Sequence, residues 1–146
     1  TLVTFSEAGD LAIDEFGLPV RNAVSGIWGN EFWSPGSTLK VDVDTSSPFA
    51  RGMPEKALAA YLANGQVYET VPGARSSDVR RVVTYIDRDI LQSGWLLGEA
   101  VIANKAAVVS VQHGQGTVLL IGFRAQHRAQ THGTFKLLFN ALMGPS

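Results

Sequence analysis

The stretch "AAVVSVQHGQGTVLLIGF", residues 106–123, decides the fold. Two apolar runs, 106–112 and 117–123, flank the segment "HGQG" at 113–116. Runs rich in β-branched residues favour β-strands, and glycine permits the positive backbone dihedrals of a tight reversal. The pattern therefore predicts an antiparallel hairpin of two buried strands.

A terminal helix is expected after this hairpin. Phe135, Leu138, Phe139 and Leu142 recur at i, i+3, i+4 and i+7. This spacing places the four side chains on one side of a helix. The sequence therefore predicts a C-terminal helix that buries this stripe.

A strand, a turn and a helix are expected at the other end of the chain. Residues 2–5 form a short apolar run suited to an interior strand. Ser6 and Glu7 then open a helix that runs to Phe16 and stops at Gly17, since glycine is the residue most often found just past a helix end. Ser6 is read as a cap of this helix, because serine is preferred there.

The middle of the chain mixes strand and helix patterns. Residues 37–44 alternate apolar and polar side chains, which predicts a strand with one wet face at a sheet edge. Residues 55–63 are rich in alanine and leucine, which favours a helix. Residues 66–71 and 80–86 favour two more strands. Interleaved helices and strands predict the α/β class.

Composition limits the kind of protein. The chain has 146 residues, 17% charged and 45% hydrophobic, with a formal net charge of -1. These values predict one globular domain over residues 1–146, with no nucleic-acid partner. No apolar run reaches the roughly 20 residues of a membrane span, so no membrane partner is expected. The absence of cysteine excludes disulfides and thiolate nucleophiles.

The amino-acid sequences of four segments are similar to a known protein region. "TLVTFSEAGDLAIDEFGLPVRN", "FWSPGSTLKVDVDTSSPFARGMPE", "SGWLLGE" and "GTVLLIGFRAQHRAQTHGTFKLLFNAL" resemble the region behind the catalytic domain in bacterial zinc carboxypeptidases of the carboxypeptidase A type. The resemblance implies that the chain is an accessory domain and a fragment of a longer hydrolase, a metallopeptidase. It also implies that the zinc belongs to that parent's catalytic domain, and that this chain holds no cofactor.

Partners and location follow from the same resemblance. The expected partner is the parent's catalytic domain, and homo-oligomerisation is left open. A secreted or periplasmic location is expected if the parent carries an export signal. The expected roles are interdomain support, assembly or ligand capture.

That region in turn resembles the class I glutamine amidotransferase fold. The resemblance implies a three-layer domain with a mixed, mostly parallel sheet, here incomplete and ending in the hairpin and terminal helix. In such enzymes a cysteine caps a strand at a sharp turn, and a histidine and a glutamate complete the triad. The resemblance implies that Ser6 occupies the position of the catalytic cysteine, Arg124 that of the histidine and Gln126 that of the glutamate.

These three residue types do not form a working triad. Arginine stays protonated and accepts no proton at neutral pH. Gln126 carries no negative charge that would stabilise a charged base. We therefore expect a degenerate site with no catalytic residue, and a chain that is itself inactive.

Two alternative functions would use Ser6 or the polar residues that follow the last strand. A small-molecule hydrolase or sugar-utilisation protein on this fold would pair Ser6 with His127 or His132 within about 3 Å. A binding site for an anion or carboxylate would use Arg124, Gln126, His127 and Arg128 as ligand-binding candidates.

A metal site is not expected in this chain. No His-x-x-Glu occurs, and no glutamate follows Glu99. His127 and His132 are five residues apart, which turns their side chains to different sides of a helix. Asp42 and Asp44 are interpreted as a solvated strand face, since two carboxylates are too few for calcium.

An aromatic-rich segment spans residues 18–37. Trp28, Phe32, Trp33 and the later Trp95 suit either a sugar- or peptide-binding groove or burial in a core or interdomain contact. We favour burial, because tryptophan is highly buried on average.

Overall fold

A computed structural model describes residues 1–75, 78–129 and 131–144. Its strands are β1 (Leu2–Phe5), β2 (Val20–Asn22), β3 (Gly36–Val43), β4 (Lys56–Leu62), β5 (Tyr68–Thr70), β6 (Val79–Tyr85), β7 (Leu91–Gly94), β8 (Ala106–His113) and β9 (Gly116–Ile121). Its helices are α1 (Ala8–Phe16), α2 (Glu99–Ile102) and α3 (Phe135–Met143), with 3-10 turns at Pro48–Ala50, His127–Ala129 and His132–Thr134.

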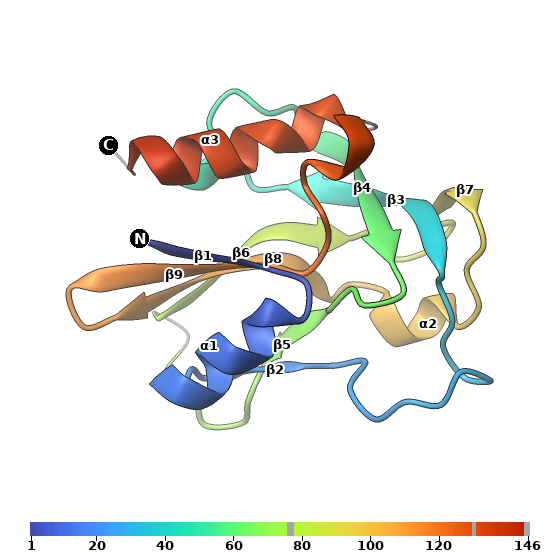
Figure 1. Cartoon of the computed structure of the whole chain (residues 1–146), viewed down its shortest axis with the longest axis horizontal. Coiled ribbons are helices and arrows are strands. Elements are labelled where there is room, and N and C mark those ends of the chain that lie inside the picture. The colour runs from blue at the N-terminus through green and yellow to red at the C-terminus, as the bar shows by residue number, and fades with distance from the viewer. Residues whose placement is uncertain (76–77, 130, 145–146) are drawn as a thin grey trace.

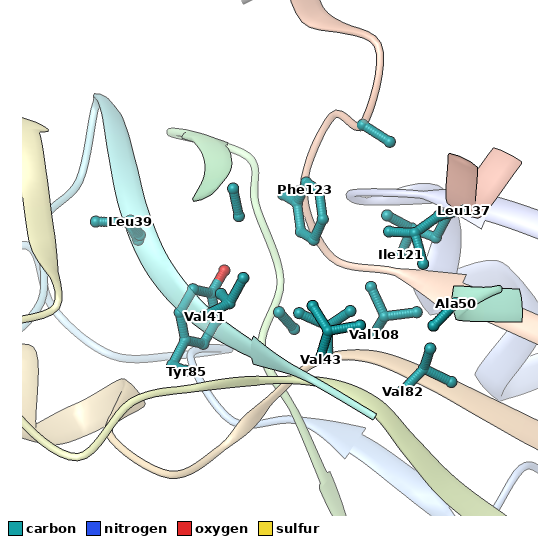
Figure 2. Close-up of a cluster of buried hydrophobic side chains, with 14 of the residues drawn as sticks. Leu39, Val41, Val43, Ala50, Val82, Tyr85, Val108, Ile121, Phe123 and Leu137 are labelled. Atoms are coloured by element: carbon teal, nitrogen blue, oxygen red, sulfur yellow. The ribbon is translucent and has the colours of Figure 1, made fainter. Parts of the chain in front are cut away.

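The strands form one sheet with helices on both faces, which confirms the mixed α/β class. Its main path runs β1-β9-β8-β6-β3-β4, with α3 over one face and α1 on the other (Figure 1). Leu119 and Ile121 pack in the cluster that contains Leu137 of α3, part of which is drawn in Figure 2. Val118 and Leu120 pack in the second cluster, on the α1 side. Successive side chains of β9 therefore point to opposite faces of the sheet and pack into the two hydrophobic clusters.

The predicted hairpin is confirmed, but the mostly parallel sheet is wrong. β8 and β9 pair antiparallel, from Val108 opposite Ile121 to His113 opposite Gly116. β1 pairs parallel with β9, ending with Phe5 opposite Ile121. Every other strand pairing in the described residues is antiparallel. A parallel neighbour needs a long crossover, and the strands in the middle of this chain follow one another without the helices that make crossovers.

The helix predicted over residues 55–63 is also wrong. This segment is β4, which pairs antiparallel with β3 from Gly36 opposite Leu62 to Asp42 opposite Lys56. Ala59 is fully buried there. Tertiary burial therefore overrides the helix propensity of alanine and leucine. As a result β3 lies between β4 and β6 and is not an edge strand.

The terminal helix is confirmed, but it buries a different stripe. Leu137 is fully buried and Ala141 nearly so, whereas Phe139 is 55% and Leu142 is 71% exposed. The side-chain nitrogen of Asn140 donates to the carbonyl oxygen of Phe49 at 2.9 Å and to that of Arg51 at 3.1 Å. Phe49 lies in the 3-10 turn Pro48–Ala50, and Arg51 directly follows it. These bonds orient α3 on the sheet.

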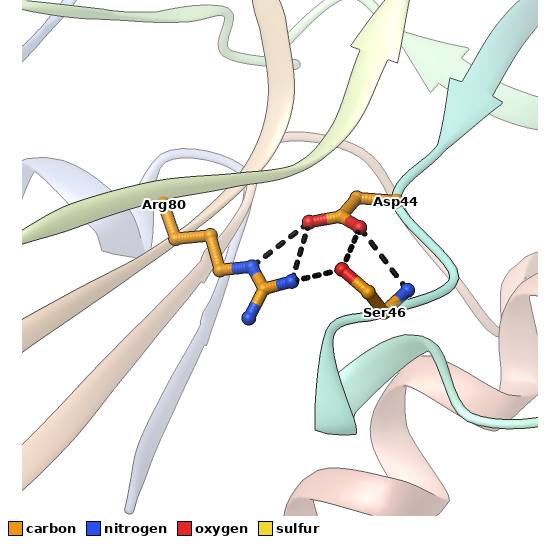
Figure 3. Close-up of polar contacts among 3 residues, drawn as sticks. All are labelled: Asp44, Ser46 and Arg80. Carbon is orange, nitrogen blue, oxygen red and sulfur yellow. Dashed lines mark hydrogen bonds and ion pairs between the residues drawn. The ribbon is translucent and has the colours of Figure 1, made fainter.

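Asp42 of β3 and Asp44, which directly follows it, form ion pairs at the surface, and this fits the solvated-face interpretation. Asp42 lies 3.2 Å from the Lys56 amine. Asp44 accepts from the Ser46 hydroxyl at 2.6 Å and from Arg80 at 2.8 Å, as Figure 3 shows. The Ser46 hydrogen bond, followed by Arg80, holds the pKa of Asp44 below its ordinary value against the opposing effect of burial.

No helix in the described part of the chain is both long and apolar enough to span a bilayer.

Candidate functional site

The turn between β1 and α1 has the geometry of a strained elbow. Ser6 has a φ of 48°, a left-handed conformation that is costly for a residue with a Cβ. Its backbone N–H donates to the carbonyl oxygen of Ile121 at 2.8 Å, and its own carbonyl accepts from Gly9 N–H at 3.0 Å. The chain therefore turns sharply from a paired strand into a helix at this one residue.

The Ser6 hydroxyl is buried and without a hydrogen-bond partner in the part of the chain that the structure describes. The cap position of α1 is Glu7, with no side-chain capping bond. The prediction that Ser6 caps the helix is therefore wrong. The contact with His127 or His132 that a Ser6 hydrolase requires is not formed either.

One pocket of about 270 Å³ brings together the three residues expected from the triad comparison. This elbow pocket is lined by Phe5, Ser6, Glu7, Ala8, Asn64, Arg124 and Gln126. Ser6 follows β1 and Arg124 comes soon after β9. Because β1 and β9 are parallel, their carboxyl ends lie at the same edge of the sheet. Arg124 and Gln126 are exposed, so they offer donors to a ligand from solvent.

A close backbone approach places the turn between β4 and β5 beside the elbow. Gln66 N–H donates to the Gly122 carbonyl at 2.7 Å. A Cβ at Gly122 would lie only 2.0 Å from the Gln66 carbonyl oxygen. Glycine is therefore needed at the end of β9, and through this contact Asn64 comes to line the elbow pocket.

The other ligand-binding candidates lie elsewhere. His127 lines a separate pocket with Ser37 and Ser93, residues of β3 and β7. Arg128 is exposed, has a φ of 45° and does not line the elbow pocket. The ring of His132 packs on Phe135 with centroids 5.4 Å apart. Of the four candidates, the structure therefore joins Arg124 and Gln126 to Ser6 and separates His127 and Arg128 from it.

A second pocket adjoins the first and shares Glu7 and Asn64 with it. This aromatic cleft has a volume of about 310 Å³. It is lined by Glu7, Asp10, Asn22, Val24, Ile27, Gly29, Phe32, Trp33, Ser34, Tyr61, Ala63, Asn64, Gly65 and Gln66. Sequence reasoning named Phe32 and Trp33 as groove candidates, but it gave no signal for the polar residues, which come from three separate segments.

The expected burial of the tryptophans in the core of this chain is wrong. Trp28 is 76%, Trp95 64% and Trp33 46% exposed. Phe32 is half-buried and packs edge-on to Tyr61, with ring centroids 6.0 Å apart. Trp33 is placed by backbone hydrogen bonds, because it forms an antiparallel bridge with Leu97. Of these four aromatic residues, Phe32 and Trp33 line the aromatic cleft.

Two carboxamides of the aromatic cleft have their oxygen atoms occupied. Asn22 Oδ1 accepts from the backbone N–H groups of Val24 and Val67, both at 3.2 Å. Gln66 Oε1 accepts from the Tyr68 hydroxyl at 2.9 Å. Burial raises the pKa of Tyr68, so this hydroxyl remains a donor. The amide nitrogens of Asn22 and Gln66 donate to no other described residue.

Within residues 1–75, 78–129 and 131–144, no three His, Cys, Asp or Glu side chains are arranged to hold a metal ion. The expectation of a chain without metal or cofactor stays a prediction.

Comparisons with known proteins assign no family. No family model and no curated protein matches the chain. Among solved structures, the chain is similar to a cytoplasmic protein from Salmonella typhimurium, with a TM-score of 0.48 and 15% identity over 86% of this chain and 42% of that one. It is also similar to a ThuA-like protein from Parabacteroides merdae, with a TM-score of 0.41 and 15% identity over 82% of this chain and 47% of that one. The chain thus spans less than half the length of either protein.

Proposed function

We propose that the chain is a noncatalytic accessory domain on a class I glutamine amidotransferase-like fold, and that its elbow pocket captures a ligand that carries a carboxylate. One observation carries the proposal most directly. Ser6 sits at a strained turn, and Arg124 and Gln126 line the same pocket without any hydrogen bond from a described residue to the Ser6 hydroxyl.

The absence of turnover follows from the chemistry of this pocket. A serine hydroxyl attacks a substrate only when a nearby base takes its proton. Arg124 does not act as a base, Gln126 is neutral, and the Glu7 carboxylate, although it lines the pocket, forms no hydrogen bond with Ser6. The strained turn therefore remains while the proton acceptor is missing.

A carboxylate is the ligand class that suits the remaining groups. The guanidinium of Arg124 presents a planar set of donors that matches a carboxylate. The pocket also includes Ala8, the first residue of α1, where helix N–H groups favour negative charge. The negative charge of Glu7 repels an anion on one side of the pocket. This favours a ligand whose remaining part is neutral or cationic, such as the carboxyl end of a peptide.

The wider context that we propose is the accessory region of a bacterial zinc carboxypeptidase. This proposal is based on the four sequence segments that resemble that region. In it, the zinc and the peptidase activity belong to the parent's catalytic domain, which is also the partner. The exposed rings of Trp28 and Trp95 support a role in interdomain contact, because large apolar side chains on a surface favour association.

Turnover and binding are tested separately. The chain and its Ser6→Ala variant are assayed for glutaminase and esterase activity, and neither is expected to exceed background. Turnover that Ser6→Ala abolishes would show an enzyme instead.

Binding is followed by NMR titration with N-acetylglycine and with N-acetylglycinamide, which lacks the carboxylate. Arg124→Gln is expected to weaken N-acetylglycine binding by about fivefold, the upper range for an exposed ion pair. Arg88→Gln, an exposed arginine outside the pocket, serves as the control of equal charge. Equal affinity for acid and amide contradicts the carboxylate site.

A further inference from the structure

We propose that the aromatic cleft binds an α-amino amide, the chemical unit at the amino terminus of a peptide. In this arrangement Glu7 and Asp10 bind the ammonium group, the free amide nitrogens of Gln66 and Asn22 bind the carbonyl oxygen, and the rings of Phe32 and Trp33 contact the side chain. The inference goes beyond the carboxylate site and does not require it.

The charge of the cleft favours a cation. Glu7 and Asp10 both line it, and none of its lining residues is a lysine, arginine or histidine. Neither carboxylate forms an ion pair within the described residues. An ammonium group bound between the two carboxylates would donate charge-assisted hydrogen bonds to them. No side chain of the cleft is a cation that could do this instead.

The buried amide of Gln66 points to an acceptor beside that cation. Gln66 is 2% exposed and yet lines the cleft. Its oxygen is occupied by Tyr68, and its nitrogen donates to no described residue. Asn22 is only half-buried, but its oxygen likewise is occupied, by two backbone N–H groups, and its nitrogen donates to no described residue. Neither nitrogen is a buried atom without a partner, so both reach the solvent of the cleft, where the carbonyl oxygen of a ligand would accept from them and a simple ammonium ion would not.

The aromatic wall and the volume set the size of the ligand. Trp33 is held in place by its bridge with Leu97, with N–H to oxygen distances of 3.1 and 2.9 Å. Together with Phe32 it offers an apolar surface next to the carboxylates, which suits both an aliphatic side chain and a cation. A volume of about 310 Å³ is at the small end of ligand pockets, so we expect one residue to enter.

Glu7 and Asp10 also have a local role that the test must separate from binding. They lie at the start of α1, where acidic side chains stabilise a helix. A purely local role lowers stability when the charges are removed and leaves the affinity for small molecules unchanged. Asp14 and Glu15 are exposed carboxylates of the same helix outside the cleft and give a variant pair with the same loss of charge.

Two ligands that differ in one charge test the inference on the unmodified protein. Calorimetric titration with leucinamide is expected to show binding, and N-acetyl-leucinamide, whose nitrogen is neutral, is expected to bind at least about tenfold more weakly, since charged hydrogen bonds contribute about 1.5–3 kcal/mol. Equal binding of the two compounds, or binding of glucose without leucinamide, overturns the proposal.

Variants then assign the site. The double variant Glu7→Gln, Asp10→Asn is expected to weaken leucinamide binding about fivefold, a loss within the range for two exposed ion pairs, while Asp14→Asn, Glu15→Gln leaves it unchanged. Trp33→Ala is expected to weaken leucinamide and N-acetyl-leucinamide alike. Arg124→Gln is expected to leave leucinamide binding intact, so failure of the carboxylate site and failure of this one give different results. Loss of affinity in the Asp14, Glu15 control as large as in the cleft variant counts against the site.

Discussion

The backbone N–H of Ser6 donates a 2.8 Å hydrogen bond to the carbonyl oxygen of Ile121, and this contact joins the end of the first strand to the end of the last. Ser6 lines the elbow pocket and leads into α1, and Ile121 leads to Arg124, which lines the same pocket. The contact keeps Ser6 in a conformation that serine rarely adopts, so this position stores a cost in stability.

Replacement of Ser6 is therefore expected to stabilise the protein. Ser6→Ala removes a buried hydroxyl without a partner and is predicted to raise the free energy of unfolding by about 1 kcal/mol. Ser6→Gly also relieves the positive φ, which is worth about 1–2 kcal/mol at a left-handed position. Urea unfolding of the two variants measures the change. Destabilisation by both variants would mean that the hydroxyl has a partner in solution.

Gly9→Ala is expected to destabilise the protein although it raises helix propensity. A Cβ at Gly9 would lie 2.6 Å from both Gln66 Oε1 and the Tyr68 hydroxyl oxygen. Overpacking of this kind costs about 1–3 kcal/mol, which exceeds the gain of about 1 kcal/mol from alanine in a helix. Thermal or urea unfolding measures the net change. Gly133→Ala is the control, because nothing lies within 4 Å of its Cβ, and it should change stability little.

The two faces of α3 predict unequal costs. Leu137→Ala is expected to lower the free energy of unfolding by about 2–4 kcal/mol, because a fully buried leucine leaves a cavity. Leu142→Ala is expected to cost less than about 0.5 kcal/mol, since that side chain is 71% exposed. Urea denaturation of the two variants compares them directly, and a reversed order would favour the stripe predicted from the sequence spacing.

The Asp44 contacts predict a small loss of stability in acid. The folded-state pKa of Asp44 lies below its ordinary value of 3.8. The contribution is therefore complete above that value and is lost as the pH falls through the lower folded pKa. Solvent screening of these partly exposed groups limits it to about 0.5–1 kcal/mol.

Ser46→Ala tests this assignment, because its hydrogen bond is the largest cause of the shift. NMR titration of the Asp44 carboxyl should show a higher pKa in the variant. An unchanged Asp44 titration would assign the effect to Arg80 and to the backbone N–H of residue 46, which the variant keeps.

Local patterns predicted the hairpin and both end helices because these elements depend on neighbouring residues. The glycines of "HGQG" and the apolar runs beside them specify a reversal without reference to the rest of the chain. Gly17 ends α1 in a left-handed conformation, with a φ of 57°, as its residue type predicted.

Non-local contacts explain the misses. Residues 56–62 form a strand because β3 lies beside them, and their own helix propensity does not report that partner. The rotation of α3 depends on two carbonyl groups near Pro48 that are far away in sequence. A spacing rule finds an apolar stripe, but it does not reveal which neighbour is present.

The candidate site divides in the same way. The elbow at Ser6 was predicted from resemblance, and Arg124 and Gln126 do lie beside it. The aromatic cleft combines the first turn of α1, the loop after β2 and the turn after β4. No local pattern marks three segments that meet only in the folded chain.

The pairing of β1 with β9 also sets the order of events during translation. Among the strands of this sheet β1 is synthesised first, but the strand that it pairs with is synthesised last. Until then the edge of β1 that pairs with β9 is open, and a chaperone or another nascent chain can occupy it. The elbow pocket therefore forms only after β9 has been synthesised, since Arg124 and Gln126 follow that strand.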